Sequence, residues 1–212
     1  GLPLSALTDP ELEAHLLKKL SFASWEDMYA GSALCSLIRI AYSQAILGHR
    51  AVSVHASAVT WQDKAFLFMG KSGTGKSTHT RLWRENIEDA KLLNDDSPII
   101  RCVDGIPTVF GSAWSGKTPC YKQERYELKA CVRLSQAPYN QISKSSILQA
   151  YGAIHPSCPP EFAYDENLYE HISGFINDLL STVPFYHLEC LPDREASLLS
   201  FKTIFGDEAD TK

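Results

Sequence analysis

A glycine-rich segment in the first half of the chain carries the residue types needed to hold a polyphosphate. Residues 70–77, GKSGTGKS, fit the pattern G-x-x-x-x-G-K-[ST] and lie between the apolar run AFLFM and a helix-like segment. Glycines let the backbone turn sharply, so that successive N–H groups and the helix N-terminus can surround an anion. The pattern predicts a nucleotide-binding loop made by Gly70, Ser72, Gly73, Thr74, Gly75, Lys76, Ser77 and Thr78.

Two side chains of this loop have predicted chemical roles. We expect the Lys76 ammonium to reach the β- and γ-phosphates of ATP, and the Ser77 hydroxyl to join the ligands of a Mg²⁺ ion. A loop of this kind binds a nucleotide in many unrelated proteins. The reaction therefore has to be inferred from other residues.

A pair of acids provides the first candidates. Asp95 and Asp96, in LLNDDSP, end a short apolar strand, and adjacent side chains on a strand point to opposite faces. One carboxylate could therefore bind the metal while the other accepts a proton from a hydroxyl group, and repulsion within one cleft would raise one pKa. The alternative is a pair of turn residues that cap the backbone before Pro98. The nearby glycine loop favours the functional interpretation.

His55 is the second candidate. It lies in SVHASA, within a run of small and apolar residues on a strand expected beside the loop strand. A lone histidine in such a run is more often a core residue than a functional one. Its functional interpretation depends on whether it lies near the two acids.

The remaining segments predict an α/β core that positions these residues. Helices over residues 8–19 and 24–48 would form a helical N-terminal segment, residues 1–50, packed on a kinase-like domain at 51–206. Alternating or continuous apolar runs predict the strands, and amphipathic runs predict the later helices. The expected strands are 51–60, 65–70, 91–94, two strands around the turn at 104–105, 127–136 and 184–191, and the expected helices are 76–86, 143–151, 165–180 and 194–205.

Composition limits the class of protein. The chain has 212 residues, a net charge of −5 and 44% hydrophobic residues, so we expect a soluble protein that does not bind nucleic acid. Its six cysteines show no metal-ligand spacing, which indicates reduced thiols and a cytoplasmic protein. No apolar run approaches the ~18 residues typical of a membrane span, so no membrane partner is expected. An apolar helix face in the N-terminal segment leaves a homo-oligomer open.

Three motifs together resemble one group of P-loop proteins. HASAV at 55–59, GKSGTGKST at 70–78 and NDD at 94–96 are similar to the HPr kinase/phosphorylase and phosphoenolpyruvate carboxykinase group. The segment GSAWSGK at 111–117 looks more like HPr-kinase-related bacterial proteins. The similarity covers residues 51–117, and it implies a mixed-sheet α/β core flanked by helices.

The resemblance also implies residue roles. Lys76 and Ser77 would hold the triphosphate and Mg²⁺, and His55 would polarise or orient one of the acids. Asp95 would be the base and Asp96 the metal ligand, although the resemblance identifies the pair more firmly than its members. A second loop containing Ser115, Gly116 and Lys117 would face the phosphates or the acceptor, or it would be a surface turn.

Departures from the group narrow the function. Ala56 stands where HPr kinases usually have Gly, Ser97 stands where they have Arg, and the downstream signature tied to phosphorolysis is missing. HPr itself and the reverse reaction are therefore not expected, and neither is decarboxylation. The sequence predicts an ATP- and Mg²⁺-dependent kinase that phosphorylates a hydroxyl, such as a serine of a protein or peptide.

Two alternatives stay open at this point. One is a kinase for a small molecule such as free serine, and the other is a nucleotide-sensing or assembly module that binds ATP without transferring phosphate. A peptide kinase should have an open groove near Lys117, whereas a small-molecule kinase should enclose its acceptor in a pocket.

Overall fold

The computed structural model describes residues 25–160, 162 and 165–206, and the chain divides into two units, residues 1–42 and 43–212. The predicted helix at 8–19 lies outside the described residues. The predicted helix at 24–48 is confirmed as α2 (Trp25–Ala45), which continues into a 3-10 turn, η2 (Ile46–His49). Packing of the N-terminal segment on the core stays a prediction.

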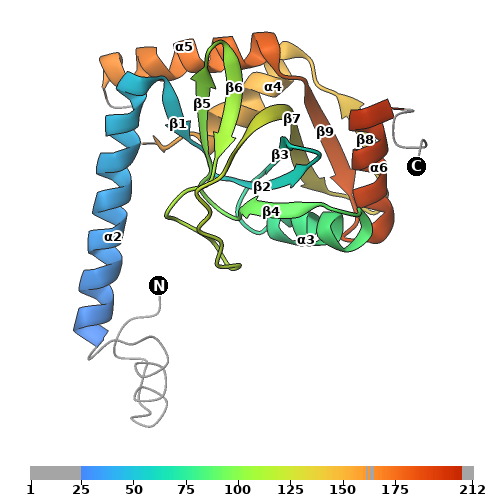
Figure 1. Ribbon diagram of the computed structural model, residues 1–212, viewed down its shortest axis with the longest axis horizontal. Helices are drawn as coiled ribbons and strands as arrows, with labels where there is room; N and C mark the ends of the chain where they lie inside the picture. The colour runs from blue at the N-terminus through green and yellow to red at the C-terminus, as the bar shows by residue number, and fades with distance from the viewer. Residues whose placement is uncertain (1–24, 161, 163–164, 207–212) are drawn as a thin grey trace. The chain divides into compact units, whose positions relative to one another are not determined.

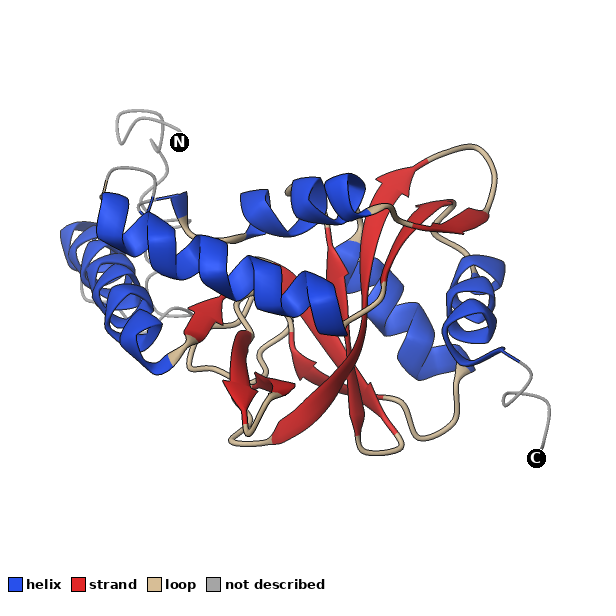
Figure 2. Cartoon of the chain, turned by 90° about the horizontal axis from the view of Figure 1, so that it is seen from above, coloured by secondary structure: helices blue, strands red, loops and turns tan. Residues whose placement is uncertain are grey.

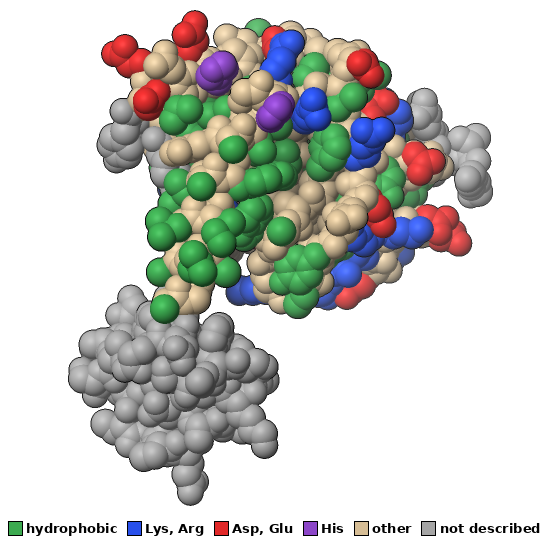
Figure 3. Space-filling model, turned by 60° about the vertical axis from the view of Figure 1, so that its left-hand side comes forward, with side chains coloured by type: hydrophobic (Ala, Val, Ile, Leu, Met, Phe, Trp, Pro, Cys, Tyr) green, Lys and Arg blue, Asp and Glu red, His purple; other side chains and the backbone are tan. Residues whose placement is uncertain are grey.

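Helix α2 exposes much of its apolar surface. Leu34, Leu37 and Ile38 are each more than half exposed, and hydrophobic side chains gather along the helix (Figure 3). The stretch Ala30–His49, with a mean hydropathy of 1.2, is long and apolar enough by length and composition to cross a membrane, although Arg39 and several serines interrupt its apolar residues. The mean hydropathy of this stretch is high because alanines and other small residues lie between its larger apolar residues, although it contains no continuous apolar run. Buried helices and signal sequences pass the same test, and the absence of a membrane partner stays a prediction.

The second unit contains a nine-stranded mixed sheet (Figure 1). Its order is β1-β5-β6-β7-β3-β2-β4, with β9 beside β7 and β8 beside β9. The β3–β7 and β7–β9 pairs are parallel and the other pairs are antiparallel. The strands are β1 (Ala51–Ser53), β2 (Ala56–Trp61), β3 (Lys64–Met69), β4 (Lys91–Asn94), β5 (Ile99–Val103), β6 (Ile106–Phe110), β7 (Arg125–Gln136), β8 (Gln141–Lys144) and β9 (Phe185–Cys190).

Helices cover both faces of this sheet (Figure 2). On one face lie α4 (Ile147–Ile154) and α5 (Glu166–Thr182), and on the other lie α3 (Lys76–Asn86) and α6 (Arg194–Phe205). Strand β3 contributes to both cores, because alternate side chains of a strand point to opposite faces. Leu67 and Met69 pack toward α4 and α5, whereas Phe66 and Phe68 pack toward α3 and α6.

Two predicted elements differ from the observed ones. The single strand expected at 51–60 is broken into β1 and β2, because the N–H groups of Val54 and His55 bond to the carbonyls of Pro98 and Ser157 instead of a neighbouring strand. The helix expected at 143–151 starts later, at Ile147, where Ser146 forms a capping box with Gln149. The residues before it form β8, an edge strand that gains its partner β9 only from distant sequence.

The topology brings the motif residues together at one end of the sheet, where β3, β7 and β9 finish. Because β3, β7 and β9 are parallel, the loop after β3 lies beside the carboxyl ends of β7 and β9. Strand β2 runs antiparallel to both β3 and β4, so the start of β2 and the end of β4 lie at the same edge. His55, the glycine loop and the acid pair therefore meet there, at the position where α/β proteins commonly bind ligands.

Candidate functional site

The glycine loop links β3 to α3, as the sequence predicts. Gly75 caps the helix with φ of 109°, a backbone conformation that favours glycine. Thr74 closes the loop, because its N–H and its hydroxyl both donate to the carbonyl of Lys71. The amide groups at the N-terminus of α3 consequently face the space above the sheet edge.

Lys76 is folded back onto the loop. Its Nζ donates to the carbonyl of Gly70 at 2.9 Å and contacts the carbonyl of Lys71 at 3.4 Å. Burial lowers the pKa of Lys76 from its ordinary value, and the negative charges of Asp96 and Asp95 oppose this shift. The Lys76 ammonium therefore lies near two carboxylates and donates only to backbone carbonyls of the loop. Such an ammonium is placed to exchange these carbonyls for the anionic oxygens of a phosphate.

A pocket of about 240 Å³ lies between the loop and the acids. Every residue that lines it is one that the sequence singled out. The lining residues are His55, Ser72, Gly73, Gly75, Lys76, Ser77, Thr78, Asp95, Asp96, Gly116 and Lys117. Three other predicted residues do not line it: Gly70 and Thr74 shape the loop, and Ser115 bonds to Thr118 and Cys120 within the second loop.

The two acids differ in their surroundings. Asp95 is buried, with 4% of its surface exposed, and both of its carboxylate oxygens accept hydrogen bonds. The Ser57 hydroxyl donates to Oδ1 at 2.9 Å, and the Thr118 N–H donates to Oδ2 at 3.1 Å. Ser57 also contacts the Thr80 hydroxyl on α3 at 3.0 Å, so Asp95 is tied to the helix that follows the glycine loop.

Asp96 is more accessible. Its side chain is 30% exposed, and its Oδ1 lies 3.8 Å from Nε2 of His55, whose side chain is 44% exposed. The Ser97 hydroxyl donates to the other carboxylate oxygen, Oδ2, at 2.9 Å. His55 thus lies beside Asp96. Its functional interpretation depended on this proximity to the acids.

Asn94 is a supporting residue that the sequence analysis missed. It is fully buried, and its Oδ1 accepts from the N–H groups of Asp96 and Ser97. Its Nδ2 donates to the Ser112 hydroxyl and the Trp114 carbonyl of the second loop. The amide side chain therefore fixes the acid turn and the second loop together, and asparagine before a turn is a local signal that could have indicated half of this role.

The second loop approaches the acids closely at Gly116. A Cβ atom there would lie 2.7 Å from the carbonyl oxygen of Asp95, so only glycine fits without a shift of the backbone. This contact brings the exposed Lys117 to the pocket. Gly116 and Lys117 of the second loop therefore line the pocket, and a role for this loop in binding stays a prediction.

Replacing Asn94 by alanine should lower the free energy of unfolding by about 2–4 kcal/mol, because it removes the hydrogen bonds by which this buried amide holds the N–H groups of Asp96 and Ser97 and the carbonyl of Trp114. Chemical denaturation measures the change. Asn86→Ala is the matched control, because the Asn86 amide makes one partly buried bond to the carbonyl of Leu82. Equal losses in the two variants would contradict the supporting role of Asn94.

The donor atoms at the site fit Mg²⁺ bound together with a nucleotide. Among the residues that the structure describes, no group of three or more His, Cys, Asp or Glu side chains could hold a metal ion alone. Mg²⁺ commonly binds one or two carboxylates and substrate phosphates and keeps several waters. Ser77, Asp95 and Asp96 supply hydroxyl and carboxylate oxygens to one pocket, which is the donor set that such an ion requires.

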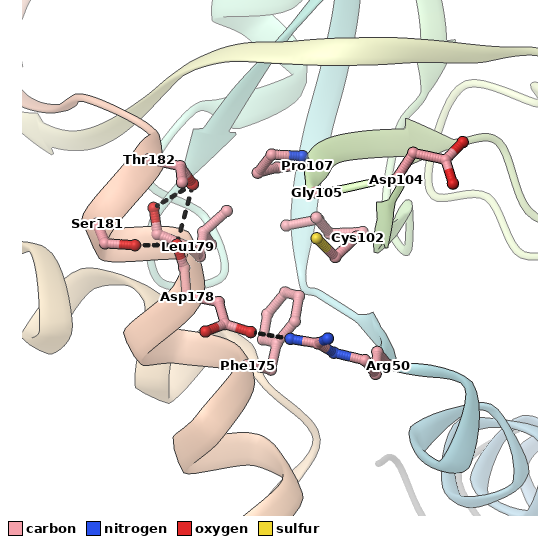
Figure 4. A pocket seen from close by; sticks show the side chains of 11 residues that line it. Arg50, Cys102, Asp104, Gly105, Pro107, Phe175, Asp178, Leu179, Ser181 and Thr182 are labelled. Atoms are coloured by element: carbon pink, nitrogen blue, oxygen red, sulfur yellow. Dashed lines mark hydrogen bonds and ion pairs between the residues drawn. The ribbon is translucent and has the colours of Figure 1, made fainter.

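Another cavity lies away from this edge, between α5 and the β5–β6 hairpin (Figure 4). Its volume is about 430 Å³, and its lining includes Arg50 and Asp178, which form an ion pair. None of the candidate catalytic, nucleotide-binding, metal-binding or substrate residues predicted from the sequence lines it. The candidate site residues that line a cavity on the glycine-loop side therefore do not extend to this cavity.

Comparisons with known proteins do not identify a family. The sequence matches no protein-family model and no curated protein. Among solved structures, the chain is similar to the Hpr(Ser) kinase/phosphatase from Coxiella burnetii, at 10% identity and a TM-score of 0.40, over 74% of this chain and 95% of that chain. A likeness at this level does not establish membership of a family, so the function has to be argued from the geometry of the site.

Proposed function

We propose that the protein transfers the γ-phosphoryl group of ATP to a hydroxyl group, and that it requires Mg²⁺. The observation that carries this proposal is the single pocket that unites Lys76 and Ser77 of the glycine loop with Asp95, Asp96 and His55. Phosphoryl transfer needs groups that hold the phosphates, a metal ligand and a group that receives the proton. This pocket offers one residue or more for each requirement.

The surroundings of the acids favour exchanging the roles that the resemblance implied. Asp95 is buried and tied to α3 through Ser57 and Thr80, so it is suited to bind the metal beside Ser77. Asp96 is more accessible, so an incoming hydroxyl can reach it. We therefore assign Asp96 as the base and Asp95 as the metal ligand.

In the proposed step, the acceptor oxygen attacks the γ-phosphorus. A new O–P bond forms while the bond from the γ-phosphorus to the bridging oxygen of ADP breaks, and the hydroxyl proton passes to Asp96. Lys76 and the amides of the loop offset the charge on the phosphate oxygens. His55, beside Asp96, orients the carboxylate, and when bound Mg²⁺ would supply further charge neutralisation.

The size of the pocket favours a polypeptide acceptor. At about 240 Å³ it is smaller than the ~300–1,000 Å³ typical of sites that enclose a small molecule, and the phosphates would take up part of it. Lys117, in its wall, is exposed. A serine side chain that projects from a peptide fits this geometry better than an acceptor that must be enclosed.

Calorimetric titration with ATP and Mg²⁺ tests the nucleotide site. We expect Lys76→Met to weaken binding at least about tenfold, because it removes a buried charge-assisted contact to phosphate. Lys71→Met, at an exposed position that the loop pattern G-x-x-x-x-G-K-[ST] leaves unspecified, is the matched control and should bind as the wild type does. Failure of the wild type to bind ATP would overturn the proposed function.

A further inference from the structure

A second cavity adjoins the glycine loop, beside the pocket that holds the acids. It has a volume of about 450 Å³, and the two hollows share Gly73, Gly75 and Thr78. The carboxyl ends of β7 and β9 form its opposite wall, with Gln136 and Leu191 among the lining residues. A ligand whose phosphates occupy the loop would therefore have this cavity within reach on one side and the acids on the other.

The lining of the second cavity differs in chemistry from the pocket. It contains no Asp, Glu, Lys or Arg, and Leu82, Leu134 and Leu191 contribute apolar surface. Its two titratable groups are neutral near pH 7, because burial lowers the pKa of His79 to about 3 and raises the pKa of the Cys190 thiol. Phosphate gains nothing from such walls, whereas a planar uncharged ring gains from burial against them.

The polar groups of the cavity are concentrated near the loop. Thr74 and Thr78 carry hydroxyls there, and the Gln136 amide donates to the carbonyl of Gly73 at 3.3 Å. Hydroxyl and amide groups between a phosphate site and an apolar hollow suit a sugar, which has hydroxyls of its own. The cavity thus combines polar groups beside the glycine loop with apolar surface from the three leucines.

We propose that the second cavity binds the nucleoside of the nucleotide whose phosphates occupy the loop. The base lies against the ends of β7 and β9, the ribose lies near Thr78, and the terminal phosphate points toward Asp96. This orientation rests on the proposed function, because it takes the acid pocket as the place of transfer. It makes the residues after β7 and β9 determinants of the preference for a nucleotide over a bare polyphosphate.

Comparison of two ligands separates the cavity from the loop. Calorimetry would measure binding of ATP and of inorganic tripolyphosphate, which shares the phosphate chain and lacks the nucleoside. We expect the wild type to bind ATP at least about tenfold more tightly, since burial of one base commonly contributes a factor of that order. Equal affinities would overturn the inference, whereas binding of neither ligand would overturn the proposed function as well.

A variant that fills the cavity makes the test specific. Ala137→Phe should remove most of the preference for ATP and leave the affinity for tripolyphosphate unchanged, because Ala137 lines the cavity and not the pocket. Ala33→Phe, at an exposed position in α2, is the matched control. A preference that survives Ala137→Phe in a folded protein would contradict the assignment.

A milder pair guards against misfolding. Leu191 is 39% exposed, so Leu191→Ala should leave the fold intact and still weaken ATP binding several-fold. Leu148→Ala, at a position that is 82% exposed and outside the cavity, should leave ATP affinity unchanged. Equal affinities of these two variants for ATP would count against a nucleoside in this cavity.

Discussion

Replacing Asp96 by asparagine should reduce the rate of phosphoryl transfer by about a thousandfold, in the range typical of a lost general base. The substitution keeps the shape of the side chain and removes its capacity to accept a proton. ATP affinity should change little, because Lys76 and the loop amides would still hold the phosphates. Single-turnover transfer and calorimetric binding of ATP measure the two quantities separately.

Asp95→Asn distinguishes the two acids. If Asp95 binds the metal, this variant should weaken binding of Mg²⁺ and ATP together, in addition to slowing transfer. Asp104→Asn, in the turn between β5 and β6, is the control for a change of charge away from the site. Full transfer activity in Asp96→Asn, with loss only in Asp95→Asn, would restore the assignment that the family resemblance implied.

Acidification should destabilise the protein through His79. This residue is 3% exposed, its ring lies tilted against that of Phe68, and burial lowers its pKa from 6.5 to about 3. Between these two values the unfolded chain binds a proton that the folded chain excludes, so stability is present above pH 6.5 and is lost as the pH falls. The expected loss is about 1.4 kcal/mol per pH unit, or about 4 kcal/mol by pH 3.5.

Hydrogen bonding indicates which ring nitrogen of the buried, neutral His79 carries the proton. Ser200 on α6 donates to the carbonyl of Ser197 and accepts from Nε1 of Trp83, so the remaining contact is a bond from Nε2 of His79 at 3.1 Å. This network joins α3, which follows the glycine loop, to the C-terminal helix. A proton on the other ring nitrogen would place an unpaired charge in the core.

Urea denaturation across this pH range isolates the effect. In His79→Leu, the free energy of unfolding should fall less steeply with decreasing pH than in the wild type, because no buried histidine remains to be protonated. In His171→Leu, at an exposed position on α5, it should fall as steeply as in the wild type. Carboxylates affect all three proteins in common, so the difference in slope is the relevant quantity. Parallel slopes for the wild type and His79→Leu would contradict the neutral buried state.

Local patterns were sufficient to predict the loop, the acid turn and most strands. The bounds of α3 and α6 were predicted correctly, because glycine or aspartate marks their starts and amphipathic spacing marks their lengths. The strand predicted at 65–70 is β3, Lys64–Met69, and it was recognisable because its residues 65–69 are apolar on both faces. These features depend only on residues that are close together in the sequence, so the sequence was sufficient to predict them.

Features that depend on distant partners were not predictable. Strand β8 forms because β9 lies beside it, and the break before β2 depends on carbonyls of Pro98 and Ser157. Likewise, Ser57 and Thr118 became recognisable as partners of Asp95 only once the sheet and the second loop were in place. The division of roles between the acids depended on these contacts, so the sequence left it open.

The central claim is that the protein transfers the γ-phosphoryl group of ATP to a hydroxyl group at the pocket that contains Asp95 and Asp96. Its most direct test is incubation of the protein with γ-labelled ATP and Mg²⁺ in the presence of serine-containing peptides, free serine or neither, followed by measurement of labelled product. The account predicts labelled peptide with the wild type and about a thousandfold less with Asp96→Asn. ATP binding without transfer to any acceptor would contradict the account and would favour a protein that senses ATP.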